Sequence, residues 1–157
     1  MNYTIRKAKL DEYSLLDDFL YEAIFIPEGV DPPSRNIIKL PELQVYIRNF
    51  GRYKGDICFV AESDGKVIGA AWTRIMNDYG HVDDDTPSLA ISLYKLHRGY
   101  GIGTTLMKEL LKEVKLQGFG SVSLAVQKAN YAYRMYKKLG FETVKETDEE
   151  YIMVNKL

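Results

Sequence analysis

Three glycines alternate with other residues where an apolar, strand-like segment meets an amphipathic helix. The run Arg98-Gly99-Tyr100-Gly101-Ile102-Gly103-Thr104 follows the apolar segment 88–96 and leads into the helical pattern of 101–117. Glycine lets the backbone turn sharply and approach a ligand closely. The first N–H groups of a helix have no internal partner, and the helix dipole adds positive charge there. The sequence therefore predicts a phosphate-binding helix start, with Arg98 as a forked cation beside it.

Two other phosphate-binding motifs do not match this sequence. A Walker loop needs Gly-Lys-Ser/Thr, and no such triplet follows the glycines. A dinucleotide fingerprint needs a third glycine where Leu106 stands, and the next strand ends at Gln127-Lys128 without an acidic ribose partner. A nucleoside triphosphatase and an NAD-binding enzyme are both disfavoured.

Periodicity and turn signals predict a mixed α/β chain forming one domain over residues 1–157. Asp64-Gly65 lies between two β-rich runs and predicts a tight hairpin turn. The loops are expected at 26–36 and 77–87. The predicted strands are 3–7, 56–63, 66–76, 88–96, 121–126, 141–145 and 151–156, and the predicted helices are 11–24, 41–50, 101–117 and 131–139.

Composition disfavours several functions. The chain has 21 basic and 22 acidic residues, so it lacks the basic excess of a general nucleic-acid binder. No apolar run approaches the roughly 20 residues of a membrane span, and the N-terminus has no signal-peptide core, so we expect a cytoplasmic protein. The single cysteine, Cys58, lies in an apolar run and is expected to be a buried, inert side chain. No Cys/His spacing indicates a metal site.

Two motifs resemble those of the GCN5-related N-acetyltransferase superfamily. Its pyrophosphate motif, Arg/Gln-x-x-Gly-x-Gly/Ala, is matched by Arg98, Gly101 and Gly103. Its second motif, Ala-x-x-x-Tyr-x-x-x-Gly-Phe, is matched by residues 132–141. The motifs occur in the family order, and the order of predicted elements is similar along nearly the whole chain. The resemblance implies a central, mostly antiparallel, twisted sheet with two splayed strands, flanked by helices.

The resemblance also implies that the chain binds acetyl-CoA. The pantetheine arm of the cofactor would lie between the splayed strands and bond backbone groups around Leu93. The family often has an asparagine on this arm three residues before the helix alanine, but that position is Ala129 here. Asn130, one residue later, either contacts the arm or caps the following helix. The diphosphate would bind the residues Arg98, Gly99, Tyr100, Gly101, Ile102, Gly103 and Thr104.

Acetyl transfer to a primary amine of a small molecule or peptide, by direct attack in a ternary complex, is the implied activity. Tyr136 matches the family tyrosine that protonates the departing thiolate, although a helix tyrosine can also serve only in packing. Asp84 and Asp85, with His81 nearby, are candidates for the general base, and the alternative is a solvated loop tip. Glu62 is a further candidate on a strand.

The acceptor pocket of this fold is built largely by the first two helices and the loop between them. Arg35 or Arg74 would suit a substrate carboxylate. A non-catalytic acyl-CoA-binding or sensing module of the same fold is the competing function, and a homodimer is possible because dimers are frequent in the superfamily. The candidate pocket residues are Phe25, Ile26, Glu28, Arg35, Tyr46, Trp72 and Arg74.

Overall fold

A computed structural model describes residues 2–157 and contains one seven-stranded sheet in the order β1-β2-β3-β4-β5-β7-β6. Neighbouring strands are antiparallel except β4 and β5, which are parallel. The mixed α/β fold with a mostly antiparallel sheet is confirmed. The strands are β1 (Thr4–Lys7), β2 (Ile57–Ser63), β3 (Lys66–Arg74), β4 (Ser88–Leu93), β5 (Ser121–Gln127), β6 (Glu142–Glu146) and β7 (Glu150–Lys156).

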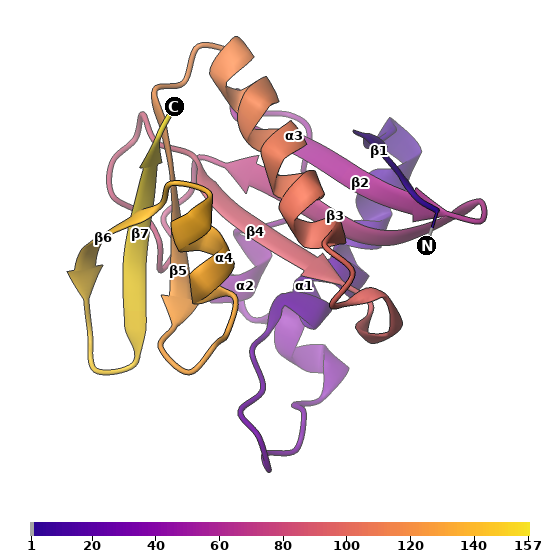
Figure 1. Ribbon diagram of the computed structural model, residues 1–157, viewed down its shortest axis with the longest axis horizontal. Helices are drawn as coiled ribbons and strands as arrows, with labels where there is room; N and C mark the ends of the chain where they lie inside the picture. Colours follow the sequence, from indigo (N-terminus) through magenta and orange to yellow (C-terminus); the bar gives the residue numbers. More distant parts are fainter. Residues whose placement is uncertain (1) are drawn as a thin grey trace.

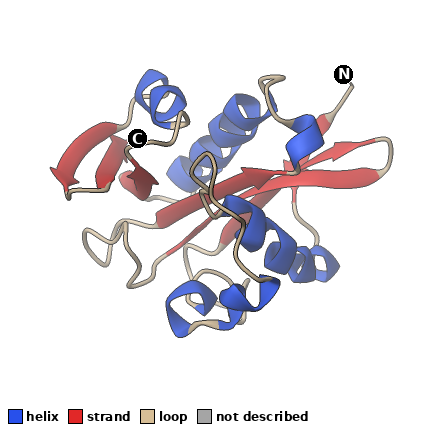
Figure 2. Cartoon of the chain, turned by 90° about the horizontal axis from the view of Figure 1, so that it is seen from below, coloured by secondary structure: helices blue, strands red, loops and turns tan. Residues whose placement is uncertain are grey.

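Helices cover both faces of the sheet (Figures 1 and 2). The α3 helix (Ile102–Leu116) and α4 (Tyr133–Lys138) pack on one face, where Leu106, Met107 and Leu110 are fully buried. The other face carries α1 (Leu16–Ala23), η1 (Leu10–Leu15), η2 (Arg35–Lys39) and α2 (Pro41–Gln44) around Phe19 and Trp72. Below, these are called the α3 face and the α1 face.

The parallel strands β4 and β5 are joined only at their beginnings. Their single backbone pair is Ser88↔Ser123, beside the hydrogen bond from Ser123 N–H to the Pro87 carbonyl (2.9 Å). Toward their carboxyl ends the strands diverge, as Figure 1 shows. The strand-order rule for open α/β sheets places ligands outside such carboxyl ends.

Several predicted boundaries were wrong for local reasons. The helix expected over 11–24 begins as the 3-10 helix η1, where the Glu12 carboxylate accepts from the Lys9 N–H (2.8 Å). The helix expected over 41–50 is regular only to Gln44, and it then continues as turns to Asn49, which has a positive φ of 55°. The loop expected over 26–36 runs into η2, and the strands expected to reach 76 and 96 end at Arg74 and Leu93.

The 3-10 helix η3 (Lys95–His97) follows β4 directly and leads into the glycine loop. No helix in the described part of the chain, residues 2–157, combines the length and apolar character needed to cross a bilayer.

Candidate active site

The glycine loop presents its backbone N–H groups outward. Gly99 and Gly101 have positive φ angles of 85° and 80°, and a Cβ built on either would meet nothing within 4 Å. Within residues 2–157, no hydrogen bond uses the N–H groups of 99–101 as donors, and α3 makes its first bond only from Thr105 to Gly101 (3.3 Å). A run of unpaired donors at the start of a 15-residue helix fits a diphosphate.

Arg98 joins this loop to two other elements. Its Nε donates to the Leu93 carbonyl (2.9 Å), and its Nη2 contacts a carboxylate oxygen of Glu22 (3.2 Å) and the Glu22 carbonyl (3.3 Å). Glu22 lies near the end of α1, so the guanidinium bridges α1, the end of β4 and the loop. In this arrangement Arg98 shapes the loop, and its charge is partly balanced by Glu22.

The divergence of β4 from β5 leaves backbone groups of β4 facing the gap. The Tyr94 N–H donates to the Ile68 carbonyl of β3 (3.0 Å), and β4 keeps one register against β3, from Arg74↔Ser88 to Gly69↔Leu93. Because alternate residues of an antiparallel strand bond the same neighbour, Ile91 and Leu93 direct their N–H and C=O groups toward β5. They meet no pairing partner on β5. An extended chain with amide groups, such as a pantetheine arm, matches this edge.

Gly103 leaves open the space between the loop and the gap. A Cβ at this position would lie 3.7 Å from Met135 Sδ, 3.9 Å from Ile91 Cδ1 and 3.9 Å from Leu93 Cδ1. Side chains of α4 and β4 therefore converge over the first turn of α3. Any larger residue here would narrow the passage from the loop into the gap.

Tyr136 lies on the same side, in α4. Its side chain is 8% exposed and contacts Phe141 edge-on, with ring centroids 6.0 Å apart. Burial raises the pKa of Tyr136 to about 12, because the phenolate would lose its solvation. The phenol therefore keeps its proton at any neutral pH, as a proton donor must.

Asn130 caps α4. Its side-chain oxygen accepts from the Ala132 N–H (2.9 Å), and its own N–H donates to the Gln127 carbonyl (2.9 Å). The side-chain oxygen is occupied by this hydrogen bond. The side-chain amide nitrogen has no such role and could donate to a ligand.

On the α1 face, the segment after β3 brings a half-buried acid to the closed end of the gap. Asp78 accepts from Tyr46 Oη (3.0 Å) with one carboxylate oxygen and from Ser88 Oγ (2.7 Å) with the other. Burial raises the pKa of Tyr46 strongly, and the negative charge of Asp78 adds to the effect. Tyr46 therefore remains a neutral donor to Asp78.

Glu150 is a second acid near Asp78. Tyr151 and Met153 of β7 pack in the core on the α3 face, so Glu150 and Ile152 alternate onto the α1 face. The pKa of Glu150 is raised, first by burial and then by the negative charges of Glu149 and Asp78. Neither acid was identified as functional from sequence, because Asp78 lay within a run of acidic loop residues and Glu150 within an acidic turn.

The structure places the predicted bases at the molecular surface. Asp84 is 95% exposed, with its carboxylate 3.5 Å from His81 Nε2, and Asp85 is exposed at the same turn. The Asp83 carboxylate accepts from the Asp85 N–H (2.9 Å) and so orders the turn. Glu62 is bound to Arg6 (2.9 Å) at the β1–β2 edge, on the opposite side of β3 and β4 from the gap.

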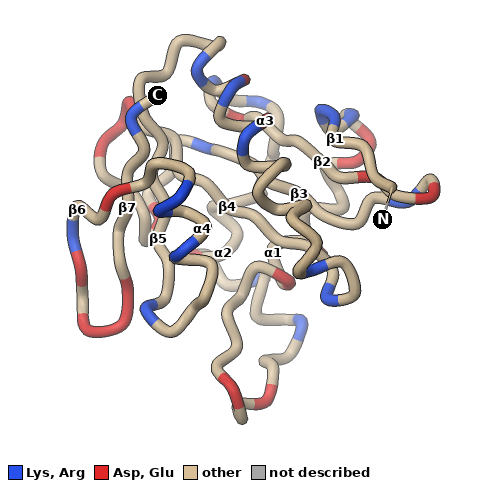
Figure 3. The backbone as a smooth tube through the Cα atoms, in the orientation of Figure 1, with Lys and Arg blue, Asp and Glu red and all other residues tan. Residues whose placement is uncertain are grey.

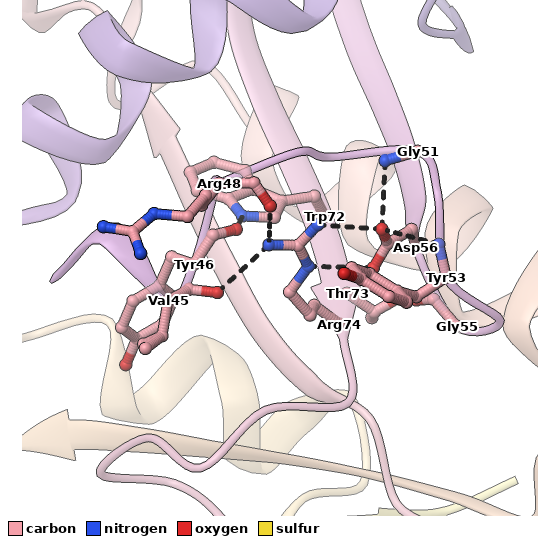
Figure 4. A network of polar contacts seen from close by, with 10 residues as sticks. All are labelled: Val45, Tyr46, Arg48, Gly51, Tyr53, Gly55, Asp56, Trp72, Thr73 and Arg74. Atoms are coloured by element: carbon pink, nitrogen blue, oxygen red, sulfur yellow. Dashed lines mark hydrogen bonds and ion pairs between the residues drawn. The ribbon is translucent and has the colours of Figure 1, made fainter. Parts of the chain in front are cut away.

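Two predicted pocket residues have structural roles instead. Arg74 donates two hydrogen bonds to Asp56 (both 2.9 Å) and two more to the carbonyls of Val45 (3.2 Å) and Arg48 (2.6 Å), as Figure 4 shows. Trp72 is fully buried, and its Nε1 donates to the Tyr46 carbonyl (3.1 Å). These bonds fix the segment that carries Tyr46. Arg74 therefore has no charge to offer a substrate carboxylate.

The remaining pocket candidates are less enclosed. Arg35 forms an exposed ion pair with Asp18 of α1, and Glu28 is exposed in the loop after α1. Phe25 and Ile26 are half-buried beside them. Within residues 2–157, no three His, Cys, Asp or Glu side chains are grouped to hold a metal ion. Cys58 is buried, and burial raises the pKa of its thiol to about 12.

Comparison with known proteins agrees with this geometry. Mouse (Mus musculus) N-acetyltransferase family 8 member 3 is 31% identical over 97 residues, which cover 60% of this chain and 43% of that protein. Mycothiol acetyltransferase of Thermomonospora curvata is 32% identical over 84 residues, 53% of this chain and 27% of that protein. The chain thus spans less than half the length of these curated relatives.

A solved structure shares the fold along the whole chain. The PaiA N-acetyltransferase of Thermoplasma acidophilum, in complex with coenzyme A, superposes with a TM-score of 0.72 at 21% identity and full coverage of both chains. The family model described as "Acetyltransferase (GNAT) family" matches residues 20–141, which include the glycine loop, both gap strands and Tyr136. The chain belongs to the acetyltransferase (GNAT) family.

Proposed function

We propose that this protein transfers the acetyl group of acetyl-CoA to a primary amine of a small molecule or peptide, by direct attack in a ternary complex. The observation that carries the proposal is the gap between β4 and β5, which opens toward the glycine loop and has, along one edge, backbone groups of β4 without a pairing partner on β5. PaiA, a neighbour in fold, was solved with coenzyme A, which supports the same ligand here.

The diphosphate, the pantetheine arm and the thioester of the cofactor each bind a different part of this chain. The diphosphate binds the N–H groups of residues 99–104, with Arg98 and Thr104 at the ends of the loop. The pantetheine arm bonds the gap edge at Leu93, and the amide nitrogen of Asn130 approaches it from the opposite side. The N–H of Ile91, farther along the same edge, polarises the thioester carbonyl. One such donor contributes roughly 3–4 kcal/mol to a transition state in other enzymes.

Tyr136 donates the proton to the leaving sulfur. Its pKa of about 12 lies above the roughly 8.5 of an ordinary thiol, so a simple transfer to a finished thiolate would be uphill. The transfer becomes favourable when it accompanies loss of a proton from the attacking nitrogen, which is strongly acidic once the new C–N bond forms. Proton donation and amine deprotonation are therefore coupled steps.

A binding measurement and a turnover measurement test the proposal. Acetyl-CoA at 100 times its Kd should stabilise the fold by about 2.7 kcal/mol, seen as a rise in Tm. Thiol release is then followed across a panel of amines. Tyr136→Phe should lower kcat by roughly 10²–10⁴-fold with little change in acetyl-CoA affinity.

Tyr133→Phe is the matched control, because Tyr133 is on the same helix but its ring stacks on Tyr151 (4.6 Å between centroids). Its kcat should stay near that of the unmodified protein. Absence of any Tm shift would contradict the proposal. Tight binding without turnover of any amine would favour a non-catalytic acyl-CoA sensor of the same fold.

A further inference from the structure

We infer that the amine acceptor enters as a cation from the α1 face and is held between Asp78 and Glu150, and that Glu150 takes its proton. This inference rests on the proposed acetyl transfer and specifies its acceptor and its base. It favours aliphatic amines with a second positive charge over amines with a nearby carboxylate.

Small residues leave room for the amine at this position. On the α1 face the gap is bordered by Ala90 of β4 and Ala125 of β5, since their strand neighbours pack in the core on the α3 face. The segment with Asp78 crosses this face closely, because a Cβ on Gly80 would lie 2.9 Å from the Ala125 nitrogen. Asp78 therefore lies at the closed end of the gap. Glu150 lies farther along, since Ala125 pairs with Ile152 and Gln127 with Glu150.

The two carboxylates have no cation of their own. Within residues 2–157, no side-chain nitrogen of Lys, Arg or His lies within 4.0 Å of a carboxylate oxygen of Asp78 or Glu150. The basic residues nearest the gap are paired elsewhere: Arg98 with Glu22, and Lys128 with Glu146 (2.6 Å). The β6–β7 turn adds further acidic residues, visible in red in Figure 3. Two neighbouring acids without a counter-charge attract an ammonium ion.

A buried hydroxyl on the same face also lacks a partner. Ser123 is fully buried at the closed end of the gap, on the strand register of Ser88, and its Oγ has no hydrogen-bond partner within the described residues. Its neighbours Val122 and Leu124 pack on the α3 face, so Ser123 points to the face that carries Asp78. A buried hydroxyl usually bonds a partner, and an ordered water or a ligand group would satisfy it.

The proton balance assigns different tasks to the two acids. Asp78 is fixed by Tyr46 and Ser88, so it holds the second, non-reacting ammonium group of the acceptor. Glu150 removes one proton from the ammonium, the freed nitrogen attacks the thioester carbon, and the C–N bond forms as the C–S bond breaks. Tyr136 gives its proton to the sulfur, and the second proton lost by the nitrogen returns through solvent to the Tyr136 phenolate, so the tyrosine is neutral again at the end of the cycle. Of the two protons, one thus appears on the thiol and one leaves to solvent from Glu150.

The pH dependence follows from the groups around Glu150. Burial raises the pKa of Glu150, and the negative charges of Glu149 and Asp78 raise it further. Tyr46 is a neutral phenol on the same face, and Lys128 is paired to Glu146. His81 is held away by its Nδ1 contact to the Met76 carbonyl (2.9 Å) and by Asp84. Because Glu150 must be ionised to accept a proton, activity should rise with pH through a pKa above that of an ordinary glutamate.

The first experiment compares two acceptors of similar length that differ in charge. Saturated with acetyl-CoA, the protein should acetylate 1,4-diaminobutane with a kcat/KM at least tenfold above that for 4-aminobutanoate. An equal or reversed preference, or turnover of other amines but not of the diamine, overturns the inference and leaves acetyl transfer intact. Failure of acetyl-CoA to bind would instead overturn both.

The second experiment uses substitutions with a matched control. Glu150→Gln should lower kcat for the diamine by roughly 10²–10⁴-fold and remove the acidic limb of the pH profile. Asp78→Asn should mainly raise the KM of the diamine and reduce its advantage over 4-aminobutanoate. Glu149→Gln, the control, removes an adjacent, exposed charge, and its pH profile should retain the acidic limb. A Glu150→Gln variant that folds, binds acetyl-CoA and retains its kcat would refute the assignment.

Discussion

The two sides of the β4–β5 gap are built differently. On the α3 face, the cofactor loop offers backbone donors that no other group uses, held by glycines with positive φ. On the α1 face, side chains from distant segments are bonded to one another, as in Arg74–Asp56 and Tyr46–Asp78. The proposed cofactor side is therefore made largely of backbone groups, while the proposed acceptor side is a framework of bonded side chains that includes the two acids Asp78 and Glu150.

The largest expected effect is on the framework of the acceptor side. Asp56→Ala leaves the buried Arg74 without its partner and removes the acceptor for the N–H groups of Gly51 and Tyr53, so the free energy of unfolding should fall by about 3–5 kcal/mol. Urea denaturation measures it. Arg35→Met, which breaks the exposed pair with Asp18, should cost less than about 1 kcal/mol. Equal effects of the two changes would contradict the contrast between a fixed framework and a loose surface.

The next effect concerns the cofactor side alone. Gly101→Val places a β-branched residue at a φ of 80°, which costs about 2–3 kcal/mol in the loop conformation that binds phosphate. Acetyl-CoA affinity, measured by calorimetry, should fall by roughly 30–150-fold. Gly120→Ala, at a glycine with open space and no positive φ, is the control and should leave the affinity unchanged. Unaltered binding in Gly101→Val would remove the diphosphate from this loop.

A smaller effect, from a substitution at Gly80, should distinguish amine binding from acetyl-CoA binding. Gly80→Ala puts a Cβ 2.9 Å from backbone atoms of Leu124 and Ala125, so the segment must shift away from β5 at a cost of about 1–2 kcal/mol. Asp78 moves with it, and the KM of the amine should rise while the Kd of acetyl-CoA stays constant. If both constants change together, the two sides are not independent.

The smallest expected effect is on stability and comes from an ion pair outside the gap between β4 and β5. Arg6 donates two hydrogen bonds to Glu12 (both 2.8 Å), which lowers the pKa of Glu12 to about 2. A lowered pKa stabilises the fold above the unfolded value near 4.3, and this contribution is lost as the pH falls toward 2. Glu12→Gln should therefore cost about 1 kcal/mol at pH 7 and progressively less below pH 4, with unchanged kinetics at pH 7. A pH-independent loss would mean that packing, not charge, is responsible.

The same contrast explains what could be predicted from sequence. The helix start after the glycine loop, the buried stripe of α3 and the helix that carries Tyr136 depend on local spacing, and the structure confirms them, while the roles of the loop and of Tyr136 in binding and catalysis remain predictions. Arg74 was misinterpreted as a substrate ligand because its partner Asp56 lies 18 residues away and meets it only through the β2–β3 register. Asp78 could not be distinguished from Asp84 and Asp85, since burial and the Tyr46 contact follow from tertiary packing. The predicted roles of Asn130 and of the loop residues remain predictions.

The single backbone pair between β4 and β5 has a mechanical consequence. Strands β1–β4 and β5–β7 form two half-sheets that meet at one hinge, with α3 packed on the first half-sheet. A ligand with amide groups bound in the gap between β4 and β5 would form the backbone hydrogen bonds that the two strands do not form with each other. It would therefore act like an eighth strand of the sheet. Loading the protein should then stiffen the hinge, slow amide hydrogen exchange at Ile91 and Leu93, and set the spacing between Asp78 and Glu150 before any amine arrives.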